Sequence, residues 1–305
     1  MAILTGMQSK LRGSAGSITF RRNGGQTIMS EKITEVRVSR TELQSRQRTK
    51  WANVIAMYKG IRPLLNYGFE ARPRNLSDYN MFVKLNMQRT PIYLTKQAVA
   101  GGACIATAYQ ITQGSLPAIV VTGTGQSGVT DIRLGSLSIT SSTTVAQFSK
   151  AVVDNNADYQ YGDQISFFMV KQLVNAATEI PYCQFSASKV MLDAADDTPL
   201  LNVVTANGFA SVDGKLGHSG NDGDCAYTWV HSRKSGGHTL VSTQELLSAN
   251  SKESDYQGDA AYTLARSSYG QTTGSFLTPD SGSGTDATPS GGGGNNGGGG
   301  GNDSL

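Results

Sequence analysis

Three histidines with acidic and thiol neighbours are the residues whose types and spacing first suggest chemistry. They are His218, His231 and His238, with Asp222, Asp224 and Cys225 between the first two. Imidazole, carboxylate and thiolate groups are the usual ligands of zinc. However, His231 shares a predicted strand with Trp229, and His218 and His238 fall in glycine-rich loops. We therefore predict strand or surface histidines and no metal site.

A second candidate cation site is the acidic cluster Asp193, Asp196 and Asp197. Its D-x-x-D-D spacing offers hard oxygen ligands to a divalent cation. A dedicated calcium loop also needs a turn glycine and a distal glutamate, and both are missing here. The cluster is more typical of a solvated turn, which is our prediction.

One glycine pattern matches a phosphate-binding fingerprint. Gly123, Gly125 and Gly128 form G-x-G-x-x-G after a predicted strand. The pyrophosphate site of this fingerprint requires a helix to follow, whereas residues 129–134 alternate like a strand. No Asp or Glu lies between Ile132 and Val153, where a ribose-binding acid is expected. We predict a glycine-rich turn between strands.

No other catalytic signature is found. The chain has no G-x-x-x-x-G-K-[ST], H-E-x-x-H, G-x-S-x-G or EF-hand pattern. Cys104, Cys183 and Cys225 are odd in number and form no C-x-x-C, so they predict small buried residues rather than a disulfide framework or zinc cage. The sequence thus predicts a protein that is not an enzyme, with no cofactor and no evident small-molecule substrate.

Charge is distributed unevenly along the chain. The 305 residues contain 26 Lys and Arg against 23 Asp and Glu, a net charge of +3. The first hundred residues hold 17 basic and 5 acidic side chains, and the remainder holds 9 and 18. The two parts therefore carry +12 and −9, which indicates a basic N-terminal unit joined to an acidic body.

The basic residues of the first part form our candidate site for an anionic partner. They are Arg12, Arg21, Arg22, Arg37, Arg40, Arg46, Arg48, Lys50, Arg72 and Arg74. Arginine suits bidentate contacts with phosphate or carboxylate. The partner is either an acidic protein surface, such as the acidic half of the same chain or of a neighbouring copy, or nucleic acid. The remaining alternative is that these residues only make the surface soluble. If six to ten of these residues contact phosphates, affinity falls about 10³–10⁵-fold between 50 and 200 mM salt.

The elements that carry these basic residues follow from local patterns. Residues 1–16 read as a flexible basic arm, and 17–31 as a hairpin whose turn is Asn23-Gly24-Gly25. A helix is predicted from near Ser39 to Leu65, with its first three turns, 40–50, projecting from the body. A second helix is predicted over 76–88, packed on the first through apolar stripes.

Beyond residue 109 the pattern favours short strands. They are predicted at 116–121, 131–139, 164–170, 184–192, 200–204, 226–231 and 239–244. Helices are predicted at 144–155 and 256–267, the second ending before Gly270. The fold class is α+β: a basic hairpin and helical unit (17–100) after the arm (1–16), a mostly antiparallel, sandwich-like acidic β domain (101–280), and a disordered Gly/Ser/Asn-rich tail (281–305).

Neither a signal peptide nor a membrane span is predicted. The N-terminus lacks a basic segment followed by a long apolar run. The longest uncharged stretch, 97–130, is too rich in Gly, Thr, Ser and Gln to cross a bilayer. We expect no membrane partner.

Several motifs together carry a family resemblance. They are residues 10–16, 25–32, 40–48 with 51–54, 76–80 with Phe82, 109–116 and 268–270. In these motifs the chain resembles uncharacterised domain-of-unknown-function proteins of Bacteroidota and their crAss-like gut phages, over residues 1 to about 280. No activity or functional residue is assigned in that family. The resemblance implies a virion or assembly component, located in the virion or the host cytoplasm.

The expected function is therefore that of a non-enzymatic structural protein, a virion-associated component of a tailed phage. Its basic N-terminal unit is expected to dock on other copies, on neighbouring virion proteins or on packaged DNA. One alternative is a DNA-binding protein that organises a genome. Another is a surface module that binds glycans or host proteins through the sandwich-like half.

Overall fold

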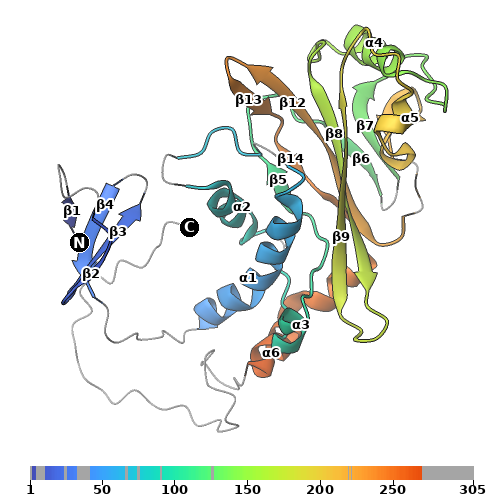
Figure 1. The fold of residues 1–305 in the computed structure, drawn as a ribbon. Helices are drawn as coiled ribbons and strands as arrows, with labels where there is room; N and C mark the ends of the chain where they lie inside the picture. The colour runs from blue at the N-terminus through green and yellow to red at the C-terminus, as the bar shows by residue number, and fades with distance from the viewer. Residues whose placement is uncertain are drawn as a thin grey trace.

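The computed structural model has the α+β fold that the sequence predicts, with helices and several antiparallel sheets (Figure 1). It describes residues 2–4, 11–23, 26–32, 42–65, 68–73, 76–89, 91–124, 127–218, 220 and 222–269. The predicted tail and three of the candidate arginines, Arg37, Arg40 and Arg74, lie outside the described residues.

The N-terminal residues form a four-stranded antiparallel sheet, which we call the N-terminal sheet. Its strands are β1 (Ala2–Leu4), β2 (Gly13–Ala15), β3 (Ile18–Asn23) and β4 (Gln26–Glu31), in the order β1-β4-β3-β2. The β3–β4 pair confirms the predicted hairpin. The prediction of an arm over 1–16 is wrong at β1 and β2, because both strands pair with the hairpin and Gly16, at φ 58°, makes the turn into β3.

A larger sheet forms the centre of the body. It contains β8 (Gln164–Val174), β9 (Pro181–Met191), β12 (Cys225–Ser235) and β13 (His238–Val241), in the order β13-β12-β8-β9, with β15 (Leu247–Ala249) also paired to β12. Residues 165–170 of β8 and 225–231 of β12 are all buried. Both faces of this sheet must therefore be covered by other layers.

A smaller sheet and two helices cover one face of the larger sheet. The sheet has the order β10 (Ala210–Val212), β11 (Lys215–Gly217), β7 (Ser127–Arg133), β6 (Val121–Thr124), and the helices are α4 (Val145–Asn155) and α5 (Leu200–Val203). Alternate residues of the central strands, including Phe167 and Trp229, join Phe148 of α4 in one core. Trp229 also donates its indole N–H to the Gly208 carbonyl at 2.8 Å.

Helices α1 (Glu42–Ile61) and α2 (Asp78–Asn86) cover the opposite face. Met57 and Phe82 pack with Phe168 and Val170, which alternate with the residues of the other core. The two helices also contact each other, as predicted, through side chains such as Tyr58 and Tyr79, whose ring centroids lie 5.3 Å apart. The division of the chain into two units near residue 100 stays a prediction. The core described here contains residues from both sides of that position.

The remaining elements close the helical side. They are α3 (Lys96–Ala100), the 3-10 helices η2 (Ala206–Gly208) and η3 (Ser251–Tyr256), α6 (Gly258–Ser268), and a two-stranded sheet of β5 (Gln110–Thr112) and β14 (Gln244–Glu245). Ser45 and Thr49 of α1 are fully or almost fully buried, and Arg46 is bonded to α6. The predicted projecting helix start is therefore wrong over residues 45–50, because α6 packs on it.

The predicted helix at 144–155 is confirmed as α4, with a capping box between Thr144 and Gln147. Four strand predictions need correction. The predicted strand 239–244 is divided between β13, which ends at Val241, and β14, which pairs with β5 in a separate sheet. Residues 200–203 are helical because Pro199 precedes a turn that buries Leu200. The stretch 116–120 is irregular up to β6, and β7 ends at Arg133 because Gly135, at φ 61°, turns the chain.

Among the helices that the structure describes, none has the length and apolar character needed to cross a membrane.

Candidate functional site

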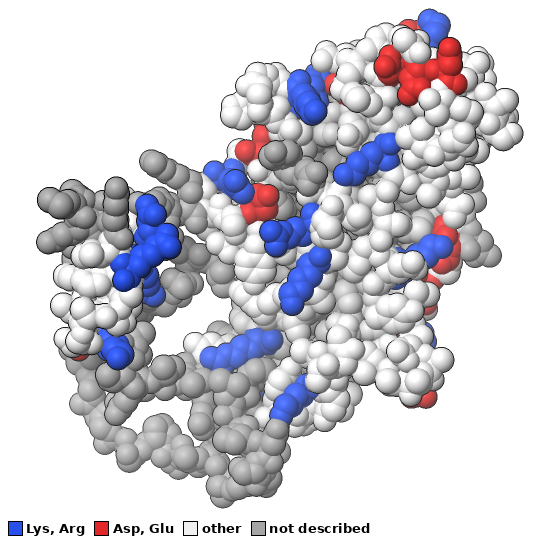
Figure 2. Space-filling view, viewed as in Figure 1, with Lys and Arg blue, Asp and Glu red and all other residues white. Residues whose placement is uncertain are grey.

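The predicted basic residues do not gather on one surface. Arg12, Arg21 and Arg22 are exposed on the N-terminal sheet, where Figure 2 shows Lys and Arg side chains close together. Acidic side chains gather beside α4 at the far end of the body in the same view. The turn that carries the Asp193 cluster is bonded to α4 there, since the Ala146 N–H donates to the Asp196 carbonyl at 2.7 Å.

Arg46 is committed to contacts inside the chain. Its Nη2 lies 2.9 Å from Asp259 Oδ1, and its guanidinium lies 4.3 Å from the centre of the Tyr262 ring. The hydrogen bond to Asp259 raises the pKa of Arg46. Arg46 therefore ties α1 to α6 and is not a residue that reaches a partner from a projecting helix.

The other described members of the candidate set on the helical side are also held close to the body. Arg48 and Lys50 are half-buried on α1. Burial, followed by the nearby charge of Arg46, lowers the pKa of Lys50. Arg72 Nη1 lies 2.5 Å from Asp78 Oδ1. The partner of Arg46, Asp259, is distant in the sequence, and that of Arg72, Asp78, is close. Counting charges along the chain predicted neither ion pair.

The N-terminal sheet has one apolar and one polar face. Residues paired directly across antiparallel strands lie on the same face. Phe20 is opposite Met29, Ile18 is opposite Glu31 and Arg22 is opposite Thr27 on one face. On the other face Thr19 is opposite Ser30, and Arg21 is opposite Ile28. We call the face with Ile18, Phe20 and Met29 the apolar face.

This apolar face is poorly covered by the described chain. Ile18 is 37% exposed, and Phe20 and Met29 are only half-buried. Of the strand residues whose exposure is described here, Thr27 alone is buried. The hydrophobic clusters found in the described residues include none of this sheet, and Figure 1 shows the sheet standing apart from the body.

A buried charge network lies at one end of the large sheet. His231 Nε2 is 2.8 Å from Asp163 Oδ2, and Arg233 contacts both oxygens of the same carboxylate at 2.7 Å. Burial works to raise the pKa of Asp163, but hydrogen bonds from Arg233, the Gln160 backbone and His231 outweigh it and hold this pKa below its usual value. Asp163 is therefore an ionised carboxylate that accepts a hydrogen bond from His231 Nε2–H.

His231 is fully buried, and burial lowers its pKa, so its imidazole is neutral near pH 7. With its one proton on Nε2, the ring carries a bare lone pair on Nδ1. That nitrogen has no hydrogen-bond partner among the described residues. Tyr159 stacks on the ring, with centroids 4.4 Å apart and planes 24° apart.

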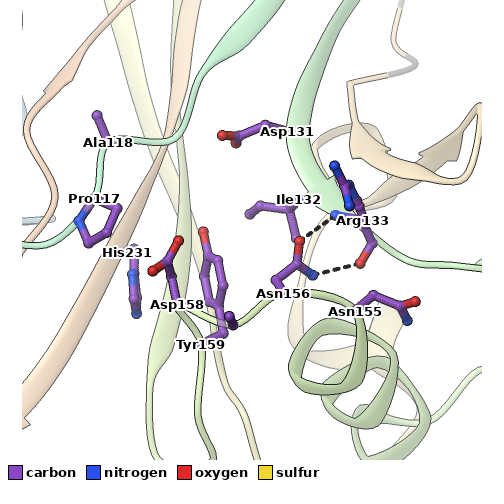
Figure 3. A pocket seen from close by; sticks show the side chains of 11 residues that line it. Pro117, Ala118, Asp131, Ile132, Arg133, Asn155, Asn156, Asp158, Tyr159 and His231 are labelled. Atoms are coloured by element: carbon purple, nitrogen blue, oxygen red, sulfur yellow. Dashed lines mark hydrogen bonds between the residues drawn. The ribbon is translucent and has the colours of Figure 1, made fainter.

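His231 lines a cavity of about 280 Å³. We call it the His231 cavity. Its wall is formed by Pro117, Ala118, Asp131, Ile132, Arg133, Asn155, Asn156, Ala157, Asp158, Tyr159 and His231. In Figure 3, Pro117 and His231 lie on one side, and Asn155 and Asn156 on the other. The cavity thus lies between β7, the segment after α4 and the end of β12.

Asn156 positions two walls of this cavity. Its Oδ1 accepts from the Arg133 N–H at 2.9 Å, and its Nδ2 donates to the Arg133 carbonyl at 2.8 Å (Figure 3). The same Nδ2 lies 2.7 Å from the Val152 carbonyl. These bonds fix the end of α4 against β7. The sequence predicted His231 as a strand residue, but its partners Asp163 and Tyr159 lie far away in the chain and gave no local signal.

The other histidines and acidic residues have structural roles. His218 follows β11 in a loop, as predicted, but it is buried, bonds to Asp222 at 3.0 Å and stacks on Tyr227. His238, also predicted in a loop, is instead the exposed first residue of β13. Lys171 completes this network with a 2.5 Å contact to Asp222. No cluster of three or more His, Cys, Asp or Glu suited to a metal occurs in the described part of the chain.

The glycine pattern and the Asp193 cluster match their predicted structures. Gly123 and Gly128 lie on the paired strands β6 and β7, so the glycine pattern is a hairpin. The Asp193 cluster is a solvated turn in which Asp193 and Asp196 accept from nearby backbone N–H groups. All three cysteines are free. Cys104 and Cys225 are buried as predicted, whereas Cys183 is half-buried.

Comparisons of the chain with protein-family models, with curated proteins and with solved structures find no match. A function for this chain has to come from its own residues and their geometry.

Proposed function

We propose that this protein is a non-enzymatic structural protein that assembles with a neighbouring copy through its N-terminal sheet. The class that its sequence resemblance favours is a virion-associated component of a tailed phage. The observation that supports assembly is that Ile18, Phe20 and Met29 on the apolar face keep part of their surface exposed, in a sheet that shares no described core with the body.

The apolar face carries enough side chain to drive an association. Full burial of a Phe, Ile or Met side chain stabilises by about 1.5–3 kcal/mol relative to exposure. Only part of this stabilisation is present in the described chain, because Ile18, Phe20 and Met29 each keep some exposed surface. A partner that covers all three side chains would add the rest of the burial free energy.

Charge complementarity favours a second copy as that partner. Arg22 is exposed on the apolar face, and the N-terminal part of the chain is basic whereas the remainder is acidic. The acidic turn at residues 193–197 presents carboxylates on the body. Contact between these unlike surfaces joins copies head to tail, which produces rings or filaments.

Sedimentation velocity over a concentration series tests this proposal. We expect the full chain to self-associate and Phe20→Asp to shift the equilibrium at least tenfold towards the monomer, because a carboxylate on the apolar face opposes its burial. Thr19→Asp is the matched control, since it places the same charge one residue away on the opposite face. A strictly monomeric chain, or equal effects of the two variants, contradicts the proposal.

A DNA-binding role is the second candidate, and the exposed Arg12, Arg21 and Arg22 favour it. Phosphate contacts do not require the apolar face, so Arg21→Gln and Arg22→Gln should each weaken duplex retention and reduce its salt dependence. In assembly through the apolar face, Arg22→Gln weakens self-association more than Arg21→Gln. Absence of retention on duplex DNA at low salt excludes this second role.

A further inference from the structure

A buried acceptor lies in the wall of the His231 cavity. His231 Nε2 donates to Asp163, so its Nδ1 holds a lone pair with no partner in the described chain. The two nitrogens of an imidazole point in widely divergent directions, and Asp163 is not among the residues that line the cavity. Nδ1 is therefore the ring atom that can accept a hydrogen bond on the side away from Asp163. A buried acceptor without a partner destabilises the protein, and a donor from a ligand would relieve this.

Most of the other polar groups around the cavity are also acceptors. Asp131 and Asp158 are exposed carboxylates at its wall. Asn155 donates its amide N–H to the Ala151 carbonyl at 2.7 Å, which leaves its amide oxygen as an acceptor. Asn156 uses both ends of its amide on the backbone of Arg133. A ligand that donates several hydrogen bonds fits this wall best.

The net charge around the cavity is negative. Asp131 and Asp158 contribute two negative charges, and Arg133 is the one cation among the lining residues. The more deeply buried Asp163 is balanced by Arg233. Burial and then the charges of Asp131, Asp158 and Asp163 raise the pKa of Tyr159, which agrees with a negative potential at this ring. This field favours a cationic ligand over an anion.

The size of the cavity limits what can enter. Its volume of about 280 Å³ lies at or below the lower end of the range, about 300 Å³ upwards, that is typical of sites for drug-sized molecules. A small amine, or the end of one Lys or Arg side chain, is of the right size. Ammonium and guanidinium groups carry only donors and a positive charge.

We propose that the His231 cavity binds an alkylammonium or alkylguanidinium group, held by His231 Nδ1 and the carboxylates of Asp131 and Asp158. This site is separate from the apolar face of the N-terminal sheet. It therefore does not depend on the assembly role, and binding of a free ligand is measured at concentrations where the chain is monomeric.

Nuclear magnetic resonance of the full chain labelled at histidine tests the proposal. The chain has only 3 His, so His231→Gln assigns the imidazole signal of His231. At pH 7.5, ethylguanidinium or ethylammonium should shift this signal saturably. The neutral N-ethylurea and the anion propionate should not. Failure of both cations to bind, or equal binding of propionate, overturns the proposal.

Variants identify the groups that hold the cation. His231→Gln keeps a donor for Asp163 but replaces the Nδ1 acceptor with an amide oxygen in a different position, so binding followed by calorimetry should weaken at least tenfold. Asp131→Asn with Asp158→Asn should weaken it at least tenfold as well, whereas Arg133→Gln should tighten it. The control Glu179→Gln with Asp255→Asn removes the same charge from two exposed positions, one in the turn between β8 and β9 and one in η3, and should leave affinity unchanged. The side chains of Asp131, Asp158 and Arg133 are on the surface, so their variants remain informative if His231→Gln does not fold. If the double Asp131 and Asp158 variant and the control variant change the affinity equally, the assignment is overturned.

The cation can come from a free amine or from a Lys or Arg of a neighbouring copy. If a neighbouring side chain supplies it, ethylguanidinium should dissociate assembled protein, and Asp131→Asn with Asp158→Asn should weaken self-association. If a free amine supplies it, self-association should be unchanged by either. Both results support a cation site and differ only in the source of the ligand.

Discussion

The N-terminal sheet and the large sheet of the body are both antiparallel, yet they differ in how their side chains are covered. Six consecutive residues of β8 are buried because helices cover one face and a second sheet covers the other. On the N-terminal sheet, even Phe20 and Met29 of the apolar face remain partly exposed. Strand pairing alone therefore does not make a core, since burial requires a second layer.

The two regions also use charge differently. Exposed arginines on the N-terminal sheet, such as Arg21 and Arg22, are available to a partner, whereas the body uses Arg46 and Arg233 to join its own elements. The basic residues of the first hundred positions are thus divided between the exposed N-terminal sheet and ion pairs within the chain, such as that of Arg46 with Asp259.

The largest expected difference between the regions concerns stability. Trp229→Ala should lower the free energy of unfolding of the body by about 3–5 kcal/mol, because it leaves a cavity in a fully buried core and an unpaired Gly208 carbonyl. Phe20→Ala should change it by less than about 1 kcal/mol. Denaturant unfolding of monomeric protein, monitored by circular dichroism, measures both. Similar losses would show that the N-terminal sheet unfolds cooperatively with the body.

A smaller effect should appear as a pH dependence that belongs to the body. Burial lowers the pKa of His231 below its ordinary value of 6.5, so the unfolded chain takes up this proton first as the pH falls. Stability should therefore decline below about pH 6.5. It should decline further below about pH 3.8, because Asp163 stays ionised in the folded state, where hydrogen bonds to Arg233, Gln160 and His231 outweigh its burial.

Melting temperatures between pH 8 and pH 3 measure this dependence. His231→Gln should flatten the part of the profile near pH 6.5 and leave the more acidic part. An unchanged profile in that variant would mean that another group controls stability near neutrality.

The smallest effect expected is that of the ion pair between α1 and α6. Asp259 is 85% exposed on its side chain, so solvent screens its contact with Arg46. Arg46→Gln should lower the free energy of unfolding by no more than about 1 kcal/mol, part of it from the lost contact with Tyr262. Arg21→Gln should have no measurable effect on stability. A larger loss at Arg21 would indicate a contact between the N-terminal sheet and the body.

Prediction from the sequence succeeded where the signal is local. The 17–31 hairpin follows from alternation around a glycine turn, and α4 follows from Thr144 and Gln147 in a capping box. It failed at residues 200–204, where apolar side chains looked like a strand. A short apolar run fits a strand or a buried helical turn equally well, and contact with the Thr143 carbonyl selected the turn.

The candidate sites divide in the same way. The sequence identified Arg12, on the predicted arm, and Arg21 and Arg22, on the predicted hairpin, as surface cations, and all three are exposed. It assigned Arg46 the same role, since the acid that binds this arginine lies 213 positions away. The His231 cavity had no sequence pattern, because its residues come from four separate stretches of the chain.

The sequence by itself determined the α+β class, the basic and acidic halves, and the local elements whose caps and turns lie within a few residues. Only the tertiary structure decided which face of each described strand is covered, which arginines are paired and that His231 Nδ1 has no partner among the described residues. The physical reason is that burial and ion pairing depend on which distant segments meet, whereas turns and caps depend on neighbouring residues.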